Sequence, residues 1–319
     1  MESKKLIESK KISVVIPCYN EAENISELYE RLSVVLKNIT TQYEIIFVDN
    51  RSTDRSENIF RNLAEKDKNV SVLFFSRNFG HSQYGYSAGT EYATGDAVIW
   101  MEGDLQDPPE VIPRFVEKWL EGFDVVYGIR PRGAGSSISR FARRIFYYIF
   151  HKLSYLNVPR DVGDFSLLDR KVVDIFNAMP ERSRFVRGLR AWIGFHHTGV
   201  EYKRAERTGG VTSNPSLRRN IWWAKKFIFS FSYAPLEFIS LLTVWLCLFT
   251  FLLLIVSIFF ALKSQISWFM VTGGVVLALF LLAPLIAIAI LAEVVGIIFE
   301  EVKNRPKYII EEILNNHHK

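Results

Sequence analysis

The amino-acid sequence predicts an α/β protein with a mainly parallel sheet, helices on both faces of that sheet, and a C-terminal two-helix transmembrane hairpin. In the first two thirds of the 319 residues, short apolar runs alternate with longer amphipathic stretches. Strict alternation of strands and helices is typical of parallel sheets covered on both faces. In the last third, two uncharged apolar runs each exceed the roughly 20 residues that cross a bilayer as a helix.

The alternation places four strands and their helices in order along the chain. The strands are expected at 12–16, 43–49, 70–75 and 97–101. Helices are expected over 20–36, opened by Asn20 and Glu21, and over 52–66, with a third helical stretch between the last two strands. In such sheets ligands bind beyond the carboxyl ends of the strands.

The two apolar runs, at 238–262 and 268–292, contain no charged residue. The loop between them is too short to hold a domain, so the runs are expected to form a hairpin. Basic residues flank its outer ends: Arg218, Arg219, Lys225 and Lys226 before it, and Lys303, Arg305 and Lys307 after it. The positive-inside rule therefore predicts an integral membrane protein with two spans, whose N-terminal domain and both termini are cytoplasmic.

These changes of composition divide the chain into four expected parts. They are a soluble domain at 1–215, an interfacial amphipathic helix at 216–235, the hairpin at 236–300 and a cytoplasmic tail at 301–319. Arginines and lysines mixed with aromatic residues indicate the interfacial helix, although a helix packed on the soluble domain has the same pattern. Because an isolated pair of spans packs poorly, we also expect a homo-oligomer.

Charge and cysteine content narrow the possible partners. The net charge of +5 comes largely from basic residues near the apolar runs. This pattern favours a membrane surface with anionic lipids as a partner and disfavours nucleic acid. Cys18 and Cys247 are the only cysteines, and one of them lies in a predicted span. Neither a disulfide nor a cysteine nucleophile is expected.

Acidic residues follow three of the predicted strands. Glu21 follows the first strand, Asp49 ends the second, and Glu102 and Asp104 follow the fourth. Since parallel strands end at one edge of the sheet, these carboxylates are expected to meet there. Glu102, Asp104 and Gln106 offer oxygen ligands suited to Mg²⁺ or Mn²⁺, with substrate phosphates completing the coordination. The alternative is a polar strand end followed by a helix cap.

An ordered set of motifs extends over nearly the whole chain. It comprises "IPCYNEAENI", "VDNRSTD", "RNFGHSQYGYSAGTEYATGDAVIWMEGDLQDPPE", "DVGDFSLLDRKVVD", "RFVRGLRAWIGF" and "EEVKNRP". This set resembles the family 2 glycosyltransferases, which have the Rossmann-like GT-A fold. Within that family it is most similar to the polyprenyl-phosphate glycosyltransferases, such as dolichol-phosphate mannose synthase and the bacterial undecaprenyl-phosphate glucosyltransferases.

The resemblance implies inverting transfer of a sugar from a nucleotide-diphosphate sugar to a polyprenyl phosphate, undecaprenyl or dolichyl, at the cytoplasmic membrane face. The product would be a polyprenyl-phosphate-linked sugar for glycan modification. A phosphate monoester with a second pKa of about 6 is largely ionised at neutral pH, so the nucleophile barely needs a general base. Catalysis must instead align two anions and neutralise the departing diphosphate, which a metal ion and arginines can do.

Several residues match the family's functional positions. Pro17, Tyr19, Glu21 and Asp49 resemble its nucleotide-binding residues, and Glu102, Asp104 and Gln106 match its metal-binding "DADLQ" motif. For Tyr19, the alternative is an ordinary aromatic residue at a strand end.

Further matches concern the sugar and the phosphates. Asp161 and Asp164 resemble residues at the sugar and acceptor centre, Asp164 on the donor side, although either could be a turn residue around Gly163. Arg130 follows the strand "DVVYG" and resembles an arginine that meets phosphate. Asp104, Asp161 and Arg130 are thus the expected catalytic residues. Arg130, Arg144 and Arg207 are the expected ligands of the acceptor phosphate, because a guanidinium binds phosphate with two hydrogen bonds. For Arg144, a surface helix position is equally compatible. His81 lies in a matching loop, where a lone histidine is more often structural.

The sequence departs from the family pattern at five positions. The usual "DDGS" has Asn50 and Arg51, and the usual "DAD" has Glu102. Ser166 and Asn214 stand where the family has Arg and Lys, so two anion-binding cations are missing, and Arg51 could replace one of them. The departures leave the nucleotide and the sugar open.

Two other functions remain possible from the sequence. A processive polysaccharide synthase shares the fold, but its "QxxRW" signature requires Gln where this chain has Arg187, and it needs more spans. A degraded enzyme that binds membranes or partners without catalysis would explain the lost charged residues.

Overall fold

The computed structural model describes residues 7, 9–130, 162–182, 184–205, 230–262 and 266–317. The described chain forms two compact units. The first holds the residues up to 205 together with 305–317, and the second holds 230–304. Asp161, Arg144, Arg207 and Asn214 lie outside the described residues, as does most of the expected interfacial helix.

The first unit is built on a sheet of eight described strands in the order β7-β5-β6-β4-β1-β2-β3-β8. The strands are β1 Ile12–Cys18, β2 Tyr43–Asp49, β3 Val70–Phe75, β4 Ala97–Trp100, β5 Val125–Ile129, β6 Val162–Asp169, β7 His197–Glu201 and β8 Ile310–Leu314. Only β6 and β8 among them run antiparallel to their neighbours. The mainly parallel sheet predicted from the sequence is confirmed.

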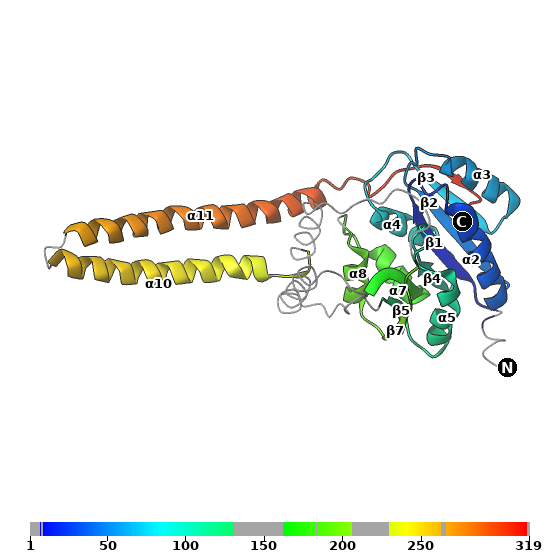
Figure 1. Cartoon of the computed structure of the whole chain (residues 1–319), viewed down its shortest axis with the longest axis horizontal. Coiled ribbons are helices and arrows are strands. Elements are labelled where there is room, and N and C mark those ends of the chain that lie inside the picture. Colours follow the sequence, from blue (N-terminus) through cyan, green and yellow to red (C-terminus); the bar gives the residue numbers. More distant parts are fainter. Residues whose placement is uncertain are drawn as a thin grey trace. The chain divides into compact units, whose positions relative to one another are not determined.

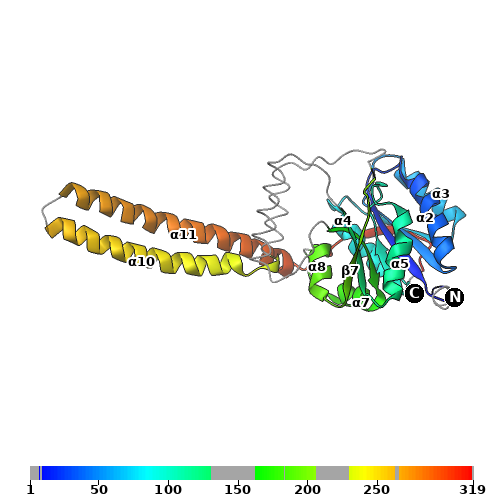
Figure 2. The same cartoon turned by 60° about the horizontal axis from the view of Figure 1, so that its bottom comes forward.

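Helices cover both faces of this sheet (Figure 1, Figure 2). One face carries α2 Ile25–Ile39, α3 Ser56–Lys66 and, after the short 3₁₀ turn η1 Pro109–Val111, α5 Ile112–Leu120. The other face carries α4 Ser82–Tyr92, α7 Arg170–Ala178 and α8 Val186–Ile193. The α/β fold with both faces covered therefore agrees with the sequence prediction.

The two faces of β1 are packed differently. Val14 and Ile16 belong to the main hydrophobic core, together with Leu28 and Leu32 of α2. On the opposite face α4 lies so close that a Cβ at Gly89 would come within 2.2 Å of Val15. A glycine is needed there because any side chain would push the helix away from the strand. The result is a rigid β1, whose carboxyl end carries the first acidic residue of the candidate site.

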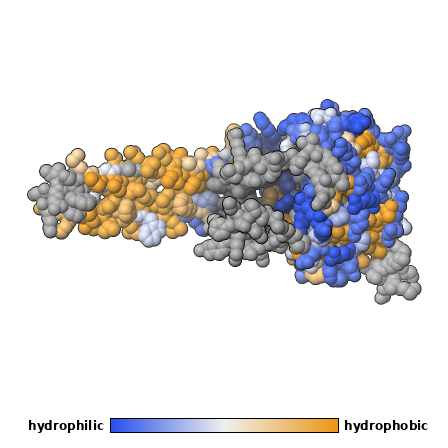
Figure 3. Space-filling view, in the orientation of Figure 1, coloured by the Kyte–Doolittle hydropathy of each residue, from blue (hydrophilic) through white to orange (hydrophobic). Residues whose placement is uncertain are grey.

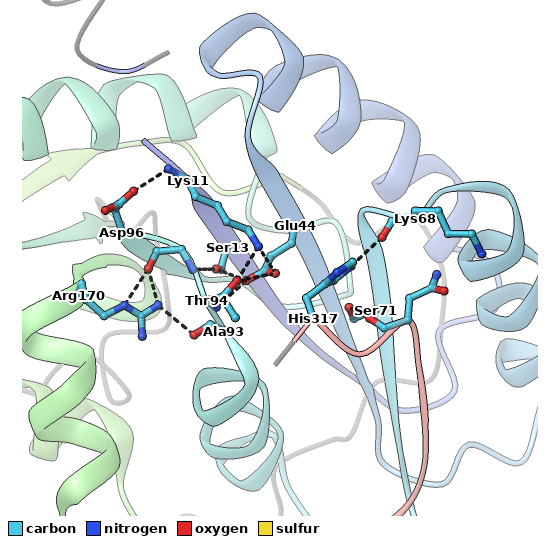
Figure 4. Close-up of polar contacts among 12 residues, drawn as sticks. Lys11, Ser13, Glu44, Lys68, Ser71, Ala93, Thr94, Asp96, Arg170 and His317 are labelled. Atoms are coloured by element: carbon cyan, nitrogen blue, oxygen red, sulfur yellow. Dashed lines mark hydrogen bonds and ion pairs between the residues drawn. The ribbon is translucent and has the colours of Figure 1, made fainter. Parts of the chain in front are cut away.

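A buried carboxylate stabilises the opposite, amino-terminal end of the sheet (Figure 4). Glu44 accepts hydrogen bonds from Ser13 Oγ at 2.6 Å, the Thr94 amide at 2.7 Å and Lys11 Nζ at 2.8 Å. Burial acts to raise the pKa of Glu44, but hydrogen bonds from Lys11 and Ser13 hold it below the usual value. The carboxylate thus links β2 to β1 and to the turn before β4.

Element boundaries differ from the sequence prediction mainly where polar turns precede helices. β2 and β3 have the predicted bounds, whereas α2 and α3 begin several residues later than expected. In both cases the intervening residues form a turn held by side chains: Asp54 accepts from the amides of Ala22 and Ser56. These residues satisfy backbone groups outside the helix, so the helix begins later.

The strand β8 was not anticipated. The sequence analysis assigned 301–319 to a tail, but 310–314 pairs antiparallel with β3 as the last described strand at that edge of the sheet. Its sequence, "IEEIL", is short, does not alternate apolar and polar residues and follows the hairpin, so no local pattern marks it as part of the first domain.

The second unit contains two long apolar helices, α10 Ala234–Leu262 and α11 Ile266–Val302. Apolar side chains cover most of their visible surface (Figure 3). By length and composition Ala234–Val256 and Met270–Val302 are candidate membrane spans, in agreement with the predicted hairpin. The cytoplasmic orientation and the homo-oligomer remain predictions.

Candidate active site

Three strand ends meet around the buried thiol of Cys18 at the end of β1. Burial raises the pKa of this thiol well above its usual value, and the carboxylates of Glu21, Asp49, Glu102 and Asp104 raise it further. Asp49 is the last residue of β2, and the other three side chains come from the loops after β1 and β4. The acidic edge expected from the sequence is therefore present, and it disfavours the thiolate form of Cys18.

Side-chain hydrogen bonds join the turns after β1 and β2. The backbone amide of Asn20 donates to Ser52 Oγ at 2.9 Å, and Thr53 N donates to Asn20 Oδ1 at 2.8 Å. The amide of Ser52 donates to both oxygens of Asp49, at 3.1 and 3.2 Å. Burial raises the pKa of Asp49, while these bonds from Ser52 act to lower it. Asp49 thus holds its own turn in shape.

Asn50 uses its amide in a way that a carboxylate could not. Its Nδ2 donates to Asn78 Oδ1 at 3.2 Å, and its Oδ1 accepts from the Phe79 amide at 2.9 Å. An aspartate at this position could accept but not donate. Asn50, which stands where the family has an acidic residue, therefore links the turn after β2 to the loop after β3.

Arg51 adopts the left-handed backbone conformation, with φ of +61°. Its guanidinium binds the carboxylate of Glu311 in β8. The sequence analysis suggested that Arg51 could replace a missing anion-binding cation, but in this structure its partner is a protein carboxylate.

The loop after β4 begins with Glu102 and Gly103. A Cβ at Gly103 would lie 2.7 Å from Cys18 Sγ, so the backbone there rests directly on the thiol. Burial raises the pKa of Glu102 to about 8, with further contributions from Asp164, Asp104 and Asp107. Among the described residues Glu102 has no hydrogen-bonding partner. Repulsion of the unpartnered Glu102 carboxylate by its acidic neighbours is what a bound cation relieves.

Asp104 and Gln106 follow in a tight turn, in which Leu105 has a φ of +58°. The Gln106 amide donates to Asp104 Oδ1 at 3.1 Å, and Arg204 lies 3.8 Å from Asp104 Oδ2. Two carboxylates and an amide oxygen in one loop are hard ligands that fit Mg²⁺ or Mn²⁺. Two protein carboxylates are also what Mg²⁺ uses when phosphates provide the remaining ligands.

Arg130 follows β5 and is held by a buried acid and a phenol. Its Nη2 lies 3.0 Å from both oxygens of Asp107, and its Nε donates to Tyr202 Oη at 2.6 Å. Tyr202 Oη in turn donates to Asp107. A Cβ at Gly163 would lie 2.5 Å from Arg130 Nη2, so the guanidinium lies against bare backbone. Sequence reasoning missed Asp107 and Tyr202; only the position of Asp107 within "EGDLQDPP" pointed toward the site.

Asp164 is paired with Arg187 of α8. Arg187 Nε and Nη2 donate to the two carboxylate oxygens at 2.6 and 2.9 Å. Burial acts to raise the pKa of Asp164, but Arg187 keeps it below the usual value. The buried Arg190 donates to the carbonyl of Gly163 at 3.2 Å, and burial lowers its pKa to about 10. In the structure Asp164 is thus paired with Arg187, and its role toward the donor remains a prediction.

The remaining predicted residues occupy less charged surroundings. Pro17 packs against α4, where a Cβ at Gly85 would lie 2.7 Å from it. Tyr19 is 43% exposed, as a ring that stacks on a ligand would be. Glu21 is buried and accepts from Asn24 Nδ2 at 2.6 Å. Ser166 lies within β6 and donates to the carbonyl of Asp164, so no cation stands at this position.

The chain is similar to known proteins over most of its length. Residues 13–176 match the model of the family described as glycosyl transferase family 2. The chain is 37% identical over 305 residues to the Uncharacterized glycosyltransferase YkcC of Bacillus subtilis, covering 94% of this chain and 93% of that protein. It is 36% identical over 313 residues to the SfII prophage-derived bactoprenol glucosyl transferase of Shigella flexneri, covering 95% and 98%. Among solved structures, the crystal structure of mannosyl-3-phosphoglycerate synthase from Rubrobacter xylanophilus matches with a TM-score of 0.49 and 16% sequence identity. The match covers 71% of this chain and 74% of that one.

Proposed function

The chain belongs to glycosyl transferase family 2 and is a glycosyltransferase; from that premise we propose that it transfers a sugar from a nucleotide-diphosphate sugar to a polyprenyl phosphate. The proposed acceptor is undecaprenyl or dolichyl phosphate, and the proposed outcome is inversion at the anomeric carbon. The main support is the single edge of the sheet at which Glu102, Asp104 and their neighbouring arginines meet. A relative of nearly equal length is named a bactoprenol glucosyl transferase, which supports a lipid-phosphate acceptor.

In this proposal the donor binds between the turns after β1 and β2. Pro17, Tyr19, Glu21 and Asp49 would hold the nucleotide, and Asp164 would face the sugar. A divalent cation, Mg²⁺ or Mn²⁺, held by Glu102, Asp104 and Gln106 would offset the charge of the departing nucleoside diphosphate. Arg204, beside Asp104, adds positive charge at the same place.

The acceptor phosphate attacks the anomeric carbon from the side opposite the leaving group. The bond between that carbon and the diphosphate oxygen breaks, a bond to the acceptor oxygen forms, and no proton needs to move because the phosphate is already ionised. Arg130 would orient the attacking phosphate, because Asp107 and Tyr202 fix its Nε and Nη2. Asp161, Arg144 and Arg207 keep the roles that the resemblance implies, near the sugar and on the acceptor phosphate.

The two candidate spans suit an acceptor that lies in a membrane. We propose that 1–215, together with the returning strand β8, forms the catalytic domain, that 216–235 lies at the interface and that both termini are cytoplasmic. The acceptor phosphate would then meet the donor at the cytoplasmic membrane face. The short hairpin gives no support to a processive synthase, because a polymer channel needs more helices.

Transfer assays test the proposal directly. Membranes containing the protein are incubated with undecaprenyl or dolichyl phosphate, Mn²⁺ and a panel of nucleotide sugars, and the lipid is analysed by mass spectrometry. We expect one donor to give a lipid heavier by one hexosyl or related unit. A long water-soluble polymer would favour a processive synthase, and the absence of any transfer with binding intact would favour a degraded enzyme.

A further inference from the structure

The segment after the hairpin is fixed to the first unit over most of its length. Only four residues separate Val302, the end of α11, from Lys307, whose Nζ donates to the Met179 carbonyl at 3.3 Å. Tyr308 stacks on Phe75, with ring centroids 5.4 Å apart.

The same attachment continues to the end of the described chain. After β8, Ser71 Oγ donates to the carbonyl of Asn315 at 2.6 Å, and Asn315 Nδ2 donates to the carbonyl of Val70 at 2.9 Å. The ring of His317 lies 2.7 Å from the carbonyl of Lys68 (Figure 4). Because these contacts are spread from Lys307 to His317, the segment is an integral part of the first unit.

Two neighbouring glutamates of β8 bind arginines in different places. Glu312 binds Arg61 of α3, which also binds Glu57 within the same helix. Glu311 binds Arg51, which lies in the turn between Asp49 and Ser52. Both pairs join an arginine to a glutamate, and the side chains of both are about half exposed. Only the pair of Arg51 and Glu311 includes a residue of the turn that follows Asp49.

Arg51 is in a backbone conformation that disfavours every residue with a Cβ. At a φ of +61° the side chain crowds the following carbonyl, and glycine is the residue that avoids this cost. Such a conformation persists only where surrounding contacts hold it. The only side-chain bond of Arg51 that involves another described residue is the one to Glu311.

We propose that Glu311 acts through Arg51 as a positioning residue for the turn Asp49–Ser52, so that the segment after the membrane hairpin forms part of the donor site. This inference rests on the proposed function, in which Asp49 binds the nucleotide. When Glu311 holds Arg51, the turn is preorganised, and the donor binds without first ordering it. The hydrogen bonds of Asp49 and Asn50 hold the rest of the turn, but without Glu311 the strained backbone at Arg51 populates other conformations. Donor binding then weakens while the chemistry of the bound donor is unchanged.

The experiment compares four variants of the full chain in detergent: Glu311→Gln, Glu312→Gln, Arg51→Gly and the double variant Arg51→Gly with Glu311→Gln. Binding of UDP and of GDP, each with Mn²⁺, is measured by calorimetry, and kcat and the donor KM by lipid transfer. Thermal unfolding is measured to check that the glutamine variants remain folded. Glu312→Gln is the matched control, because it removes an equivalent pair from the same strand.

We expect Glu311→Gln to weaken binding of the preferred nucleotide about fivefold and to raise the donor KM equally, with kcat kept. Glu312→Gln should stay within about twofold of wild type. Arg51→Gly removes both the strain and the partner of Glu311, so adding Glu311→Gln to it should change binding no further.

Equal effects of Glu311→Gln and Glu312→Gln, in a protein that binds nucleotide and transfers sugar, would overturn the inference and leave the proposed function standing. Strong loss of binding in Arg51→Gly would also overturn it, because Arg51 would then contact the donor itself. A wild-type protein that binds neither nucleotide, and that transfers sugar to the lipid from no donor of the nucleotide-sugar panel, would overturn both the inference and the proposed function.

Discussion

Asp107 holds Arg130 by two contacts, with Nη2 of the arginine 3.0 Å from each carboxylate oxygen. The acid is fully buried and lies at the start of the Pro-Pro turn, while the arginine follows a different strand. Tyr202 closes the triangle through its hydroxyl. These contacts already restrict the conformations of the guanidinium. Binding a phosphate therefore costs less conformational entropy than it would for a free arginine side chain.

The hydroxyl of Tyr202 provides the mildest test of this arrangement. Tyr202→Phe keeps the packing but removes the bonds to Arg130 and Asp107, so we expect kcat/KM for the lipid acceptor to fall about tenfold. Stability should fall by about 1 kcal/mol, the typical net contribution of a hydrogen bond. Tyr29→Phe removes a bond of 2.9 Å to Asp67, far from the site. It should cost similar stability with full activity; equal activity in the two variants would rule out the positioning of Arg130.

Glu102 makes the stability of the metal-free protein depend on pH. Its pKa rises from an ordinary value of about 4.3 to about 8 on folding. The folded state therefore retains a proton that the unfolded state releases, and the free energy of unfolding falls as pH rises from about 5 to 8. Glu102→Gln should flatten this fall, which is measured as the unfolding temperature in EDTA across that range.

Mn²⁺ provides the control for that measurement. At about pH 8 it should raise the unfolding temperature of the wild type, because it binds the folded form with Glu102 ionised. It should have little effect on Glu102→Gln. Parallel pH profiles of the two metal-free proteins would contradict the burial of this carboxyl among other acids.

The contact between Gly103 and Cys18 predicts a compensating pair of substitutions. Gly103→Ala would place a Cβ 2.7 Å from Cys18 Sγ and displace the loop that carries Glu102 and Asp104. We expect a loss of about 1–3 kcal/mol in stability and about tenfold in activity. Removing the sulfur as well, in Cys18→Ala with Gly103→Ala, should restore most of both. Failure of this rescue, with Cys18→Ala itself active, would show that the alanine disturbs something other than the thiol contact.

Much of the fold and part of the site could be predicted from the sequence. Strands such as 43–49 and 70–75 are marked by the short apolar runs "IIFV" and "VLFF" between polar turns, because both faces of a parallel sheet are covered. The acidic edge could be predicted in the same way, because strands that alternate with helices run parallel and their carboxyl ends lie at one edge of the sheet.

The partners of the site residues could not be predicted in this way. Arg187 and Asp164 are 23 positions apart, and nothing local indicates that α8 brings them together. The link between Arg51 and Glu311 spans 260 positions and depends on a strand that returns after the hairpin. Such pairings depend on tertiary packing, which local patterns of hydrophobicity do not encode.

The most direct test of the central claim compares Asp104→Asn with Asp174→Asn in the lipid-transfer assay with Mn²⁺ and the donor that the wild type uses. Asp104 is a proposed ligand of the cation and lies in the loop after β4. Asp174 is an exposed residue of α7 whose side chain is 63% accessible. The account predicts that Asp104→Asn loses at least about a hundredfold in kcat while remaining folded, and that Asp174→Asn transfers like the wild type. Near-normal transfer by a folded Asp104→Asn protein would contradict the account.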